Sequence, residues 1–415
     1  MMNVSSTRIK RFLDELAEFN ATPGKGITRM SYSPQAREAR GWLRKQMEQA
    51  GLQVRKDAMG NVIGTLPGAS PSLPAVMIGS HFDTVPHGGA FDGAAGVIMA
   101  LEIATLFHEQ GLKPDYPLEV VALVEEEGAS FERGLLASSA MAGHITAQTL
   151  ANLRDSAGIS AAQRMADAGY APQEITSVVR APESLKAFIE LHIEQGPVLE
   201  QTGTDIGIVD VIVGMTQLTV TLTGKAGHAG TTPMDRRQDA LVAASHIISQ
   251  VGDFARQAGE ATVATVGKLQ VYPNGSNVIP HQVVFSVDIR SRDEQKLRQV
   301  IEQTREAIHR QAVDGISANI EQTLYVPPTP MDPEITHNLG QQCDKLGFSC
   351  KTMVSGAGHD AMIFAGLTPT GLVFVPSRDG LSHHPDEWTD AEQIAKGVEV
   401  IFHAVKTITE ARSHD

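Results

Sequence analysis

Apolar residues near the start of the chain recur at the spacing of helix turns. One helical face collects five of them: Ile9, Phe12, Leu13, Leu16 and Phe19. Such spacing predicts an amphipathic helix. A second helix is predicted between Ser33-Pro34 and Gly51, because Ser caps helix N-termini, Pro fits the first helical position and Gly ends helices.

Downstream, short apolar runs alternate with helical patterns. Strands are predicted at 52–55, 61–66 and 75–80. A helix that is apolar on nearly all sides follows from about residue 93 to residue 109. The apolar run 118–124 ends in Glu125-Glu126-Glu127 and is typical of a central strand in a buried sheet. Strands that alternate with helices predict an α/β layer.

The middle of the chain follows a different order. Its predicted elements are strand 217–223, helix 239–255, strand 262–271, strand 283–290, helix 293–311 and strand 318–325. This β-α-β-β-α-β order is typical of ferredoxin-like units, which can fold as domains of their own. Turn-forming residues near Gly214 and Pro327-Pro328 predict its borders.

The α/β pattern then resumes. A helix is predicted near 334–346, a strand at 370–375 and a helix at 391–411. We therefore expect an α/β fold with two domains. Residues 1–213 and 329–415 would form one discontinuous domain, and residues 214–328 would form a smaller domain inserted into it.

The bulk composition limits the choice of partners. The chain has 415 residues, 42% of them hydrophobic and 20% charged, and a formal net charge of -14. This charge disfavours nucleic acid and anionic membranes, because both bind clusters of Lys and Arg. A local Arg or metal ion can still bind an anionic substrate. We expect a cytoplasmic protein, because the chain has only two cysteines, its first ten residues are polar, and it has no apolar run of membrane length.

A histidine and two aspartates follow the predicted strand 75–80. His81 comes directly after this strand, where a parallel sheet places its ligands. Asp83 would point to the same side in an extended chain, so it could hold the other ring nitrogen of His81. Asp92 lies in a glycine-rich loop, where the backbone can approach a metal ion closely. The alternative for this segment is a polar turn that caps the following helix.

Three further groups of polar residues stand at the ends of predicted elements. They are Glu125-Glu126-Glu127, His192 after the apolar run 187–191, and His383-His384 before the last helix. Adjacent carboxylates at a buried strand end repel one another unless cations are present. Imidazole together with carboxylate favours Zn²⁺, Mn²⁺, Ni²⁺ or Co²⁺. Taken singly, each group could instead be a solvated acidic loop or an ordinary histidine.

Taken together, the motifs resemble those of a known family. The sequence is similar to the metal-dependent amidase and carboxypeptidase superfamily called M20. Within it, the sequence resembles the branch of N-carbamoyl-L-amino-acid hydrolases, β-ureidopropionases and allantoate amidohydrolases. The motifs run in order from Gly79 to Glu387, and the string His192-Ile-Glu-Gln-Gly-Pro is specific for that branch. The other matching segments are His81-Phe-Asp83, Asp92-Gly93, Glu126-Glu127-Gly128, Gly227-His228-Ala229-Gly230 and Ser382-His383-His384-Pro385.

The resemblance implies a site for two divalent metal ions in the discontinuous domain. The implied ligands are His81, Asp92 and His192 for one ion, and Glu127 and His383 for the other, with Asp92 bridging both. Glu126 matches the general base of the family, and Asp83 matches the residue that orients the first histidine. His384 stands where many relatives have Asn.

The resemblance also implies substrate contacts. His228, in the inserted domain, resembles a residue that reaches the neighbouring active site of a homodimer and stabilises an oxyanion. Asn277 and Arg290 resemble a clamp for the substrate carboxylate, Gln195 a further contact, and Gly358 part of a glycine loop at the substrate. A guanidinium suits this role because it binds a carboxylate through two hydrogen bonds. Without the resemblance, Arg290 is more simply a surface charge at a strand end.

These roles predict an enzyme that hydrolyses the carbamoyl C–N bond of a small ureido substrate that bears a carboxylate. Glu126 would take a proton from a water between the two ions and deliver it to the departing nitrogen. Carbamoyl-α-amino acids, carbamoyl-β-alanine, allantoate and ureidoglycolate all fit, and the products would include ammonia and CO₂. A metallo-aminopeptidase or dipeptidase on the same fold is the nearest alternative. A catalytically inactive, ligand-binding relative is a further one.

Overall fold

The protein is described by a computed structural model that covers residues 4–70, 72–259 and 261–410. The chain forms two compact units. The larger unit contains Met1–Asp210, Met331–Met353 and His359–Asp415, and the smaller one contains Val211–Pro330 and Val354–Gly358. The predicted domain assignment, with borders after residues 213 and 328, stays a prediction.

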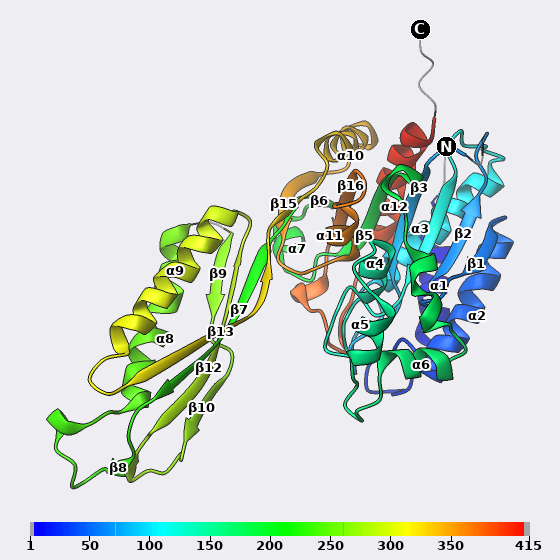
Figure 1. Ribbon diagram of the computed structural model, residues 1–415. Helices are drawn as coiled ribbons and strands as arrows, with labels where there is room; N and C mark the ends of the chain where they lie inside the picture. Colours follow the sequence, from blue (N-terminus) through cyan, green and yellow to red (C-terminus); the bar gives the residue numbers. More distant parts are fainter. Residues whose placement is uncertain (1–3, 71, 260, 411–415) are drawn as a thin grey trace. The chain divides into compact units, whose positions relative to one another are not determined.

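A mixed sheet forms the centre of the larger unit (Figure 1). Its strands are β1 (Gln53–Lys56), β2 (Val62–Leu66), β3 (Ala75–His81), β4 (Leu118–Leu123), β5 (Leu185–Ile193), β6 (Ile206–Ile212), β15 (Cys350–Ser355) and β16 (Thr370–Val375). The strand order is β1-β2-β4-β3-β5-β16-β6-β14, where the two-residue β14 (Thr329–Pro330) pairs with Ile212 and Val211 of β6, and β15 also pairs with β6. The four central strands β4, β3, β5 and β16 are parallel, whereas β1, β2 and β6 pair antiparallel with their neighbours.

Helices cover both faces of this sheet. The helices of the larger unit are α1 (Ser6–Ala17), α2 (Pro34–Gln49), α3 (Ala94–Glu109), α4 (Leu136–Met141), α5 (Ala147–Asn152), α6 (Ala161–Asp167), α7 (Val198–Thr202), α10 (Pro333–Leu346), α11 (Asp360–Phe364) and α12 (Ala391–Thr409). Leu191 of β5 faces α12, where a Cβ on Gly397 would come within 2.5 Å of Leu191 Cδ1. Phe188 projects from the opposite face, and its ring centroid is 4.3 Å from that of Phe364 in α11.

The core of the larger unit explains the uniformly apolar character of α3. Every residue of β3 and β4 is buried, and α3 packs on β3, β4 and β5 while α1 and α12 pack on α3. A helix that is enclosed by a sheet and by two other helices has little surface for polar residues, and the buried Glu102 of α3 is paired with Arg8. The prediction of a helix apolar on nearly all sides is therefore confirmed.

The smaller unit is an antiparallel sheet packed on two helices. Its elements are β7 (Gly214–Thr223), β8 (Gly227–His228), α8 (Ala240–Ala258), β9 (Thr262–Thr265), β10 (Leu269–Tyr272), β11 (Val278–Ile279), β12 (Gln282–Ser291), α9 (Glu294–Gln311), β13 (Ser317–Val326) and β14 (Thr329–Pro330). The strand order is β10-β12-β7-β13, with β9 also on β12, and β8 pairs with β11. Helices α8 and α9 pack together and bury one face of the sheet.

The helices and strands named from the sequence are present, with two corrections. The single strand predicted at 262–271 is wrong, because β9 and β10 are separate strands that pair with different parts of β12. The last helix ends at Thr409, and residue 411 lies outside the described residues. The predicted start of the second helix is confirmed, since the Ser33 side chain accepts from Ala36 N–H.

Several elements were missed because their sequences lack a clear period. The short helices α4, α5 and α6 occupy the segment between β4 and β5, and β6 was also missed. Strand β15 is exposed along its first half, so its residues show no apolar alternation. A seven-residue 3₁₀ segment lies at Pro172–Val178, and three-residue 3₁₀ segments lie at Pro182–Ser184, Met234–Arg236 and Arg378–Gly380.

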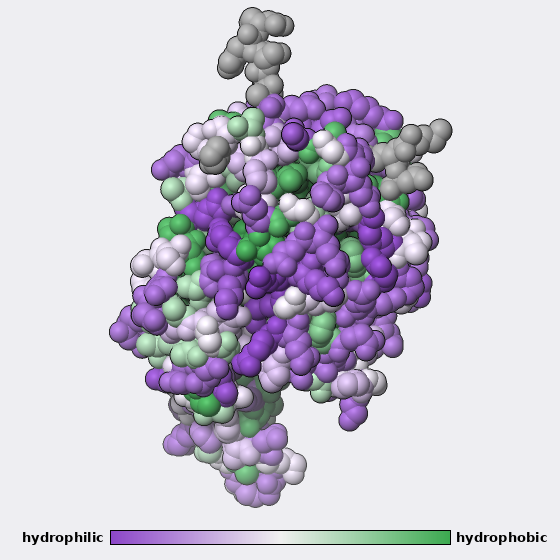
Figure 2. All heavy atoms as spheres, turned by 90° about the vertical axis from the view of Figure 1, so that its right-hand side faces the viewer, coloured by the Kyte–Doolittle hydropathy of each residue, from purple (hydrophilic) through white to green (hydrophobic). Residues whose placement is uncertain are grey.

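The visible surface is largely hydrophilic. On the face drawn in Figure 2, purple hydrophilic residues predominate and green hydrophobic residues occur in small groups. Among the described residues, no helix combines the length and the apolar composition that crossing a lipid bilayer requires.

Removing a core aromatic ring from the smaller unit tests this packing. Phe285 of β12 is 1% exposed among side chains of the sheet, α8 and α9, so we expect Phe285→Ala to destabilise the unit by about 3–5 kcal/mol. Val263 of β9 is 55% exposed, and Val263→Ala should change stability by less than about 0.5 kcal/mol. Hydrogen exchange of β7 and β12 measures both effects. Equal protection in the two variants would contradict the packing.

Candidate metal centre

Parallel strands deliver histidines and carboxylates to one edge of the large sheet. His81 is the last residue of β3, and His192 is the residue before the last of β5. Glu126 and Glu127 follow the end of β4. Because β3, β4 and β5 are parallel, their carboxyl ends meet at the same edge. The fold thus brings together side chains that are far apart in the sequence.

Asp92 lies in the middle of this group, just before α3. Its Oδ1 is 3.4 Å from His81 Nε2 and 3.0 Å from His192 Nε2. Its Oδ2 is 3.0 Å from Nε2 of His383, which comes from the loop after β16. The same His383 nitrogen is 3.3 Å from Glu127 Oε2. The two oxygens of one carboxylate therefore face two different groups of ligand atoms.

The hydrogen bonds of the two buried histidines fix which nitrogen faces Asp92. His192 Nδ1 is 2.8 Å from the carbonyl oxygen of Ile193, and His81 Nδ1 is 3.1 Å from that of Asp83. A carbonyl only accepts, so each Nδ1 carries the hydrogen and each neutral ring presents a lone pair at Nε2. Lone pairs directed at a carboxylate require a proton or a cation between them.

Burial makes this arrangement costly without added positive charge. The side chains of Glu126 and Glu127 are 11% and 7% exposed, and that of Asp92 is 6% exposed. Burial, with Glu127 adding to it, raises the pKa of Glu126 well above its usual range. Burial acts in the same direction on Asp92, but without metal ions the three histidines can carry protons, and hydrogen bonds from the protonated rings outweigh burial and hold the pKa of Asp92 well below its usual range. Glu127 Oε1 is buried and has no hydrogen-bond partner within the described part of the chain, as expected of an oxygen that serves as a metal ligand.

The residues present fit divalent metal ions. Two sets of ligand atoms each lie within 4.8 Å of one another: a first ligand set of His81, Asp92 and His192, and a second ligand set of Asp92, Glu127 and His383. A third grouping of His81, Glu126 and Glu127 overlaps both. Imidazole nitrogens with carboxylate oxygens suit Zn²⁺, Mn²⁺, Co²⁺ and Ni²⁺. His384, next to His383, is exposed, and its Nδ1 accepts from Asp386 N–H instead.

Asp83 joins the loop after β3 to the glutamate turn. Its carboxylate accepts the backbone N–H groups of Glu126 and Glu127, both at 3.3 Å. Its Oδ1 lies 3.7 Å from His81 Nδ1, farther than its own carbonyl oxygen. Asp83 therefore contacts His81 more closely through its main chain than through its side chain. The role in orienting His81 stays a prediction.

Gln195 lies beside Asp92. Its Nε2 donates to Asp92 Oδ2 at 2.9 Å and to Ser382 Oγ at 3.1 Å. Gln195, His383 and Glu125 all have left-handed backbones, with φ of 57°, 55° and 56°. Such strain in non-glycine residues gathers where the surrounding structure holds functional groups in place.

The remaining sequence-predicted residues belong to the smaller unit. His228 lies on β8, opposite β11, and the neighbouring Ala229 N–H bonds to the Asn277 carbonyl. The pairing of β8 with β11 therefore brings His228 and Asn277 near each other. His228 is exposed, and its Nδ1 accepts from Gly230 N–H at 3.0 Å, so the neutral ring keeps its hydrogen on Nε2.

Arg290 and the glycine loop form a second group in the smaller unit. The guanidinium donates to Asp288 Oδ1 at 2.9 Å and to the Gly356 carbonyl at 2.7 Å. Gly358 is two residues further along this loop, and a Cβ there would meet no atom within 4 Å. The loop has room for side chains or a ligand at this position.

Buried residues near the ligand sets were missed by sequence reasoning. The ring of His359 is 4.5 Å from that of His192 between centroids, and Glu190 accepts from Ser80 Oγ and Ala361 N–H. Arg29 donates to the Phe82 carbonyl, and burial lowers its pKa to about 10. Glu387 bonds to the loops of Asp92 and His383. His359, next to Gly358 in the glycine loop, and Glu387, four residues after His383, each lie in a motif that could have pointed to them.

Comparisons with known proteins agree with this geometry. The family model for the peptidase family M20/M25/M40 matches residues 77–407. An N-carbamoyl-L-amino-acid amidohydrolase of Paenarthrobacter aurescens is 42% identical over 98% of this chain and 99% of that protein. An allantoate amidohydrolase of Escherichia coli (strain K12) is 38% identical over 95% of each protein. An amidase of the hydantoinase/carbamoylase family from Burkholderia multivorans has a TM-score of 0.90 at 35% identity, over 98% of both chains.

These matches extend over nearly the whole chain and confirm the resemblance seen in the motifs. They also confirm the α/β fold class. M20 proteins are metal-dependent, and the two ligand sets give this chain a candidate metal-binding cluster. The chain belongs to the peptidase family M20/M25/M40, in the branch that includes N-carbamoyl-L-amino-acid amidohydrolases and allantoate amidohydrolases.

Proposed function

We propose that this chain is a metal-dependent amidohydrolase that cleaves the ureido C–N bond of N-carbamoyl-L-amino acids or allantoate. The observation that carries the proposal is the Asp92 carboxylate, whose two oxygens face two ligand sets. The full-length similarity to enzymes named for these substrates supports the same activity.

In this proposal, each ligand set binds one divalent ion and Asp92 belongs to both. Ions bound there would activate a water molecule and polarise the carbonyl of the substrate. Zn²⁺, Mn²⁺, Co²⁺ and Ni²⁺ all accept these nitrogen and oxygen ligands. The protein holds the ligand atoms ready through strand ends and through hydrogen bonds to the rings of His81 and His192.

Glu126 is the proposed general base. Its Oε2 is 3.7 Å from His81 Nε2, so the carboxylate borders the first ligand set without being part of it. Because burial raises its pKa, this carboxylate holds a proton more readily than an exposed glutamate does. It can therefore take a proton from the attacking water and return it to the departing nitrogen. Hydrolysis consumes water and releases the amino product, ammonia and CO₂.

Residues of the smaller unit complete the proposed set of substrate contacts. Arg290 and Asn277 would bind the substrate carboxylate, and Gly358 of the smaller unit and Gln195 of the larger unit would each add a further contact. The Nε2–H of His228 would stabilise the oxyanion in a neighbouring subunit of a homodimer, as oxyanion-hole donors do. The net charge of -14 supports a small molecule rather than nucleic acid or membrane as partner. The low number of cysteines supports a cytoplasmic location.

A substrate panel tests the activity directly. Protein loaded separately with Mn²⁺, Zn²⁺, Co²⁺ or Ni²⁺ is offered N-carbamoyl-L-amino acids, carbamoyl-β-alanine, allantoate, ureidoglycolate and dipeptides. We expect ammonia release from N-carbamoyl-L-amino acids or allantoate and no cleavage of dipeptides. Dipeptide cleavage alone would establish the peptidase alternative, and loaded protein that is inert toward every substrate would be the inactive relative.

Replacing the proposed base separates proton transfer from metal binding. We expect Glu126→Gln to lower kcat by about 10²- to 10⁴-fold, because an amide cannot take up the proton. The metal content, measured by mass spectrometry, should stay at the wild-type level, since Glu126 is outside both ligand sets. Glu132→Gln, which changes an exposed glutamate in the same loop, is the matched control. Normal turnover by Glu126→Gln would remove the base from this mechanism.

Gly93 tests whether His81 belongs to a metal site. Its φ is 62°, and a Cβ there would lie 2.3 Å from His81 Cε1, so Gly93→Ala should displace the ring and weaken ion binding. Gly111 has nearly the same φ, 61°, but a Cβ there meets no atom within 4 Å. Both alanines place a Cβ at positive φ, a conformation that L residues rarely adopt, so Gly111→Ala controls for the change of glycine at such a φ. Calorimetric titration should show weakened binding for Gly93→Ala alone; the same ion affinity in both variants contradicts the assignment.

A further inference from the structure

A buried glutamate joins two loops of the metal centre. The carboxylate of Glu387, which is 3% exposed, accepts hydrogen bonds at both oxygens. Its Oε1 accepts the backbone N–H groups of Phe91 and Asp92, both at 3.0 Å. Its Oε2 accepts from Ser382 Oγ at 2.9 Å and from His383 N–H at 3.3 Å. One side chain therefore bonds to the loop that carries Asp92 and to the loop that carries His383.

The contacts of Glu387 leave it no place as a metal ligand. An ionised carboxylate can only accept hydrogen bonds, and both of its oxygens already accept them here from N–H and O–H groups. Among the described residues, it belongs to neither ligand set. Glu387 therefore acts on the centre through Asp92 and His383 rather than by touching an ion.

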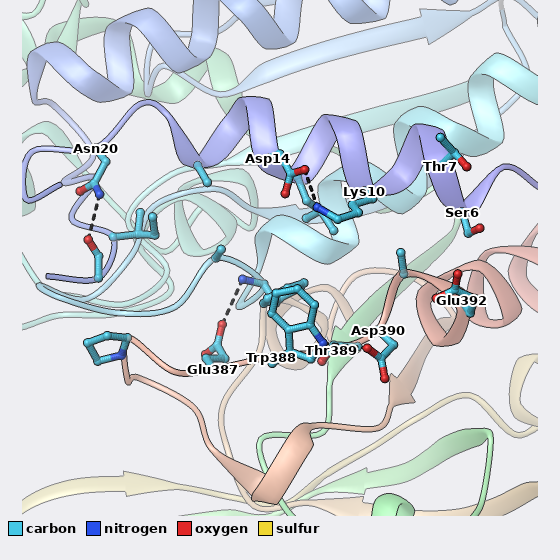
Figure 3. A pocket seen from close by; sticks show the side chains of 18 of the residues that line it. Ser6, Thr7, Lys10, Asp14, Asn20, Glu387, Trp388, Thr389, Asp390 and Glu392 are labelled. Carbon is cyan, nitrogen blue, oxygen red and sulfur yellow. Dashed lines mark hydrogen bonds and ion pairs between the residues drawn. The ribbon is translucent and has the colours of Figure 1, made fainter. Parts of the chain in front are cut away.

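The surroundings of Glu387 keep it against the Asp92 loop. A Cβ on Gly89 would lie 2.1 Å from Glu387 Oε1, so only a glycine lets this loop come so close. The other side of Glu387 borders a cavity of about 510 Å³ between α1 and the segment 385–392. In Figure 3, the dashed line from Glu387 marks its bond to the Phe91 backbone, and Trp388 packs beside it against Phe91.

We propose that Glu387 is a positioning residue that ties the Asp92 loop to the His383 loop, so that Asp92 and His383 can share one divalent ion. The inference rests on the proposed metal site and adds the residue that assembles its second ligand set. His81 and His192 stand on neighbouring parallel strands of the sheet, which hold them without Glu387. Loss of Glu387 should therefore affect the second ligand set far more than the first.

Glutamine is the informative replacement at this position. A carboxylate offers two accepting oxygens, whereas an amide offers one oxygen and one NH₂ group that only donates. Glu387→Gln can therefore keep its bonds to one loop, but its NH₂ group then faces at least one backbone N–H group of the other loop, which cannot accept a hydrogen bond. The side chain keeps its size, so the adjoining cavity does not grow.

Metal titration provides a readout that is independent of turnover. Metal-free wild type and Glu387→Gln are titrated with Mn²⁺ in a calorimeter. We expect two binding events in the wild type, and in Glu387→Gln one event weakened by about 10- to 100-fold while the other is unchanged. Glu127→Gln removes a ligand of the second set alone, so it should weaken the same event and identify it.

Glu392→Gln is the matched control. Glu392 is an exposed glutamate that lines the same cavity and stands five residues from Glu387, so its replacement should leave both binding events unchanged. If Glu387→Gln melts well below the wild type, Glu387→Ala with added acetate replaces it. Acetate is small enough to enter the cavity, and it should restore the weakened event without altering the wild type.

The outcomes separate this inference from the proposed function. The role of Glu387 alone would be overturned if the wild type hydrolyses ureido substrates and binds two ions, and Glu387→Gln binds both ions as tightly as the wild type does. Equal weakening of both events, or no response of Glu387→Ala to acetate, would also overturn it. Wild type that binds no ions and cleaves no ureido substrate would overturn both proposals.

Discussion

The carboxylate of Asp92 needs positive charge on both sides, and the architecture of the larger unit follows from that need. Its Oδ1 faces the Nε2 atoms of His81 and His192, and its Oδ2 faces His383. When His81 and His192 are neutral, their Nδ1 hydrogens bond to carbonyl oxygens, so each Nε2 offers Asp92 a lone pair rather than a proton. Charges this close and this buried interact strongly, because little water screens them. In the proposed site, two divalent cations would satisfy these groups at once, and this is how the geometry supports the proposed hydrolytic metal chemistry.

The scaffold holds these groups mainly through backbone contacts. Parallel strands place the histidines at one sheet edge, and Asp83 bonds to the backbone of the Glu126-Glu127 turn. Arg29 bonds to the carbonyl of Phe82, between His81 and Asp83. Supporting contacts of this kind keep metal ligands in one orientation and so reduce the cost of binding the ion. The left-handed backbones at Gln195 and His383 show that the loops are held against their local preference.

The sequence was most informative where burial leaves a clear pattern of apolar residues. Buried strands such as β3 and β5 are nearly continuous apolar runs, so their ends, and with them His81 and His192, could be located. Spacing alone could not show that Asp92, Glu127 and His383 converge, and the family resemblance supplied that grouping. Glu387 ends the run of motifs, but its contacts could not be predicted, because its bonding partners include a backbone N–H group 295 positions away, which no local pattern reports. Strand β15 was missed because exposed edge strands lack an apolar alternation, and the split between β9 and β10 is set by how each pairs with β12.

Anomalous diffraction from crystals grown with Mn²⁺ tests the central claim most directly, because it locates ions without reference to activity. The account predicts two peaks per chain, both bonded to Asp92, with His81 and His192 completing one site and Glu127 and His383 the other. A single peak, or two peaks of which one has no bond to Asp92, would contradict it.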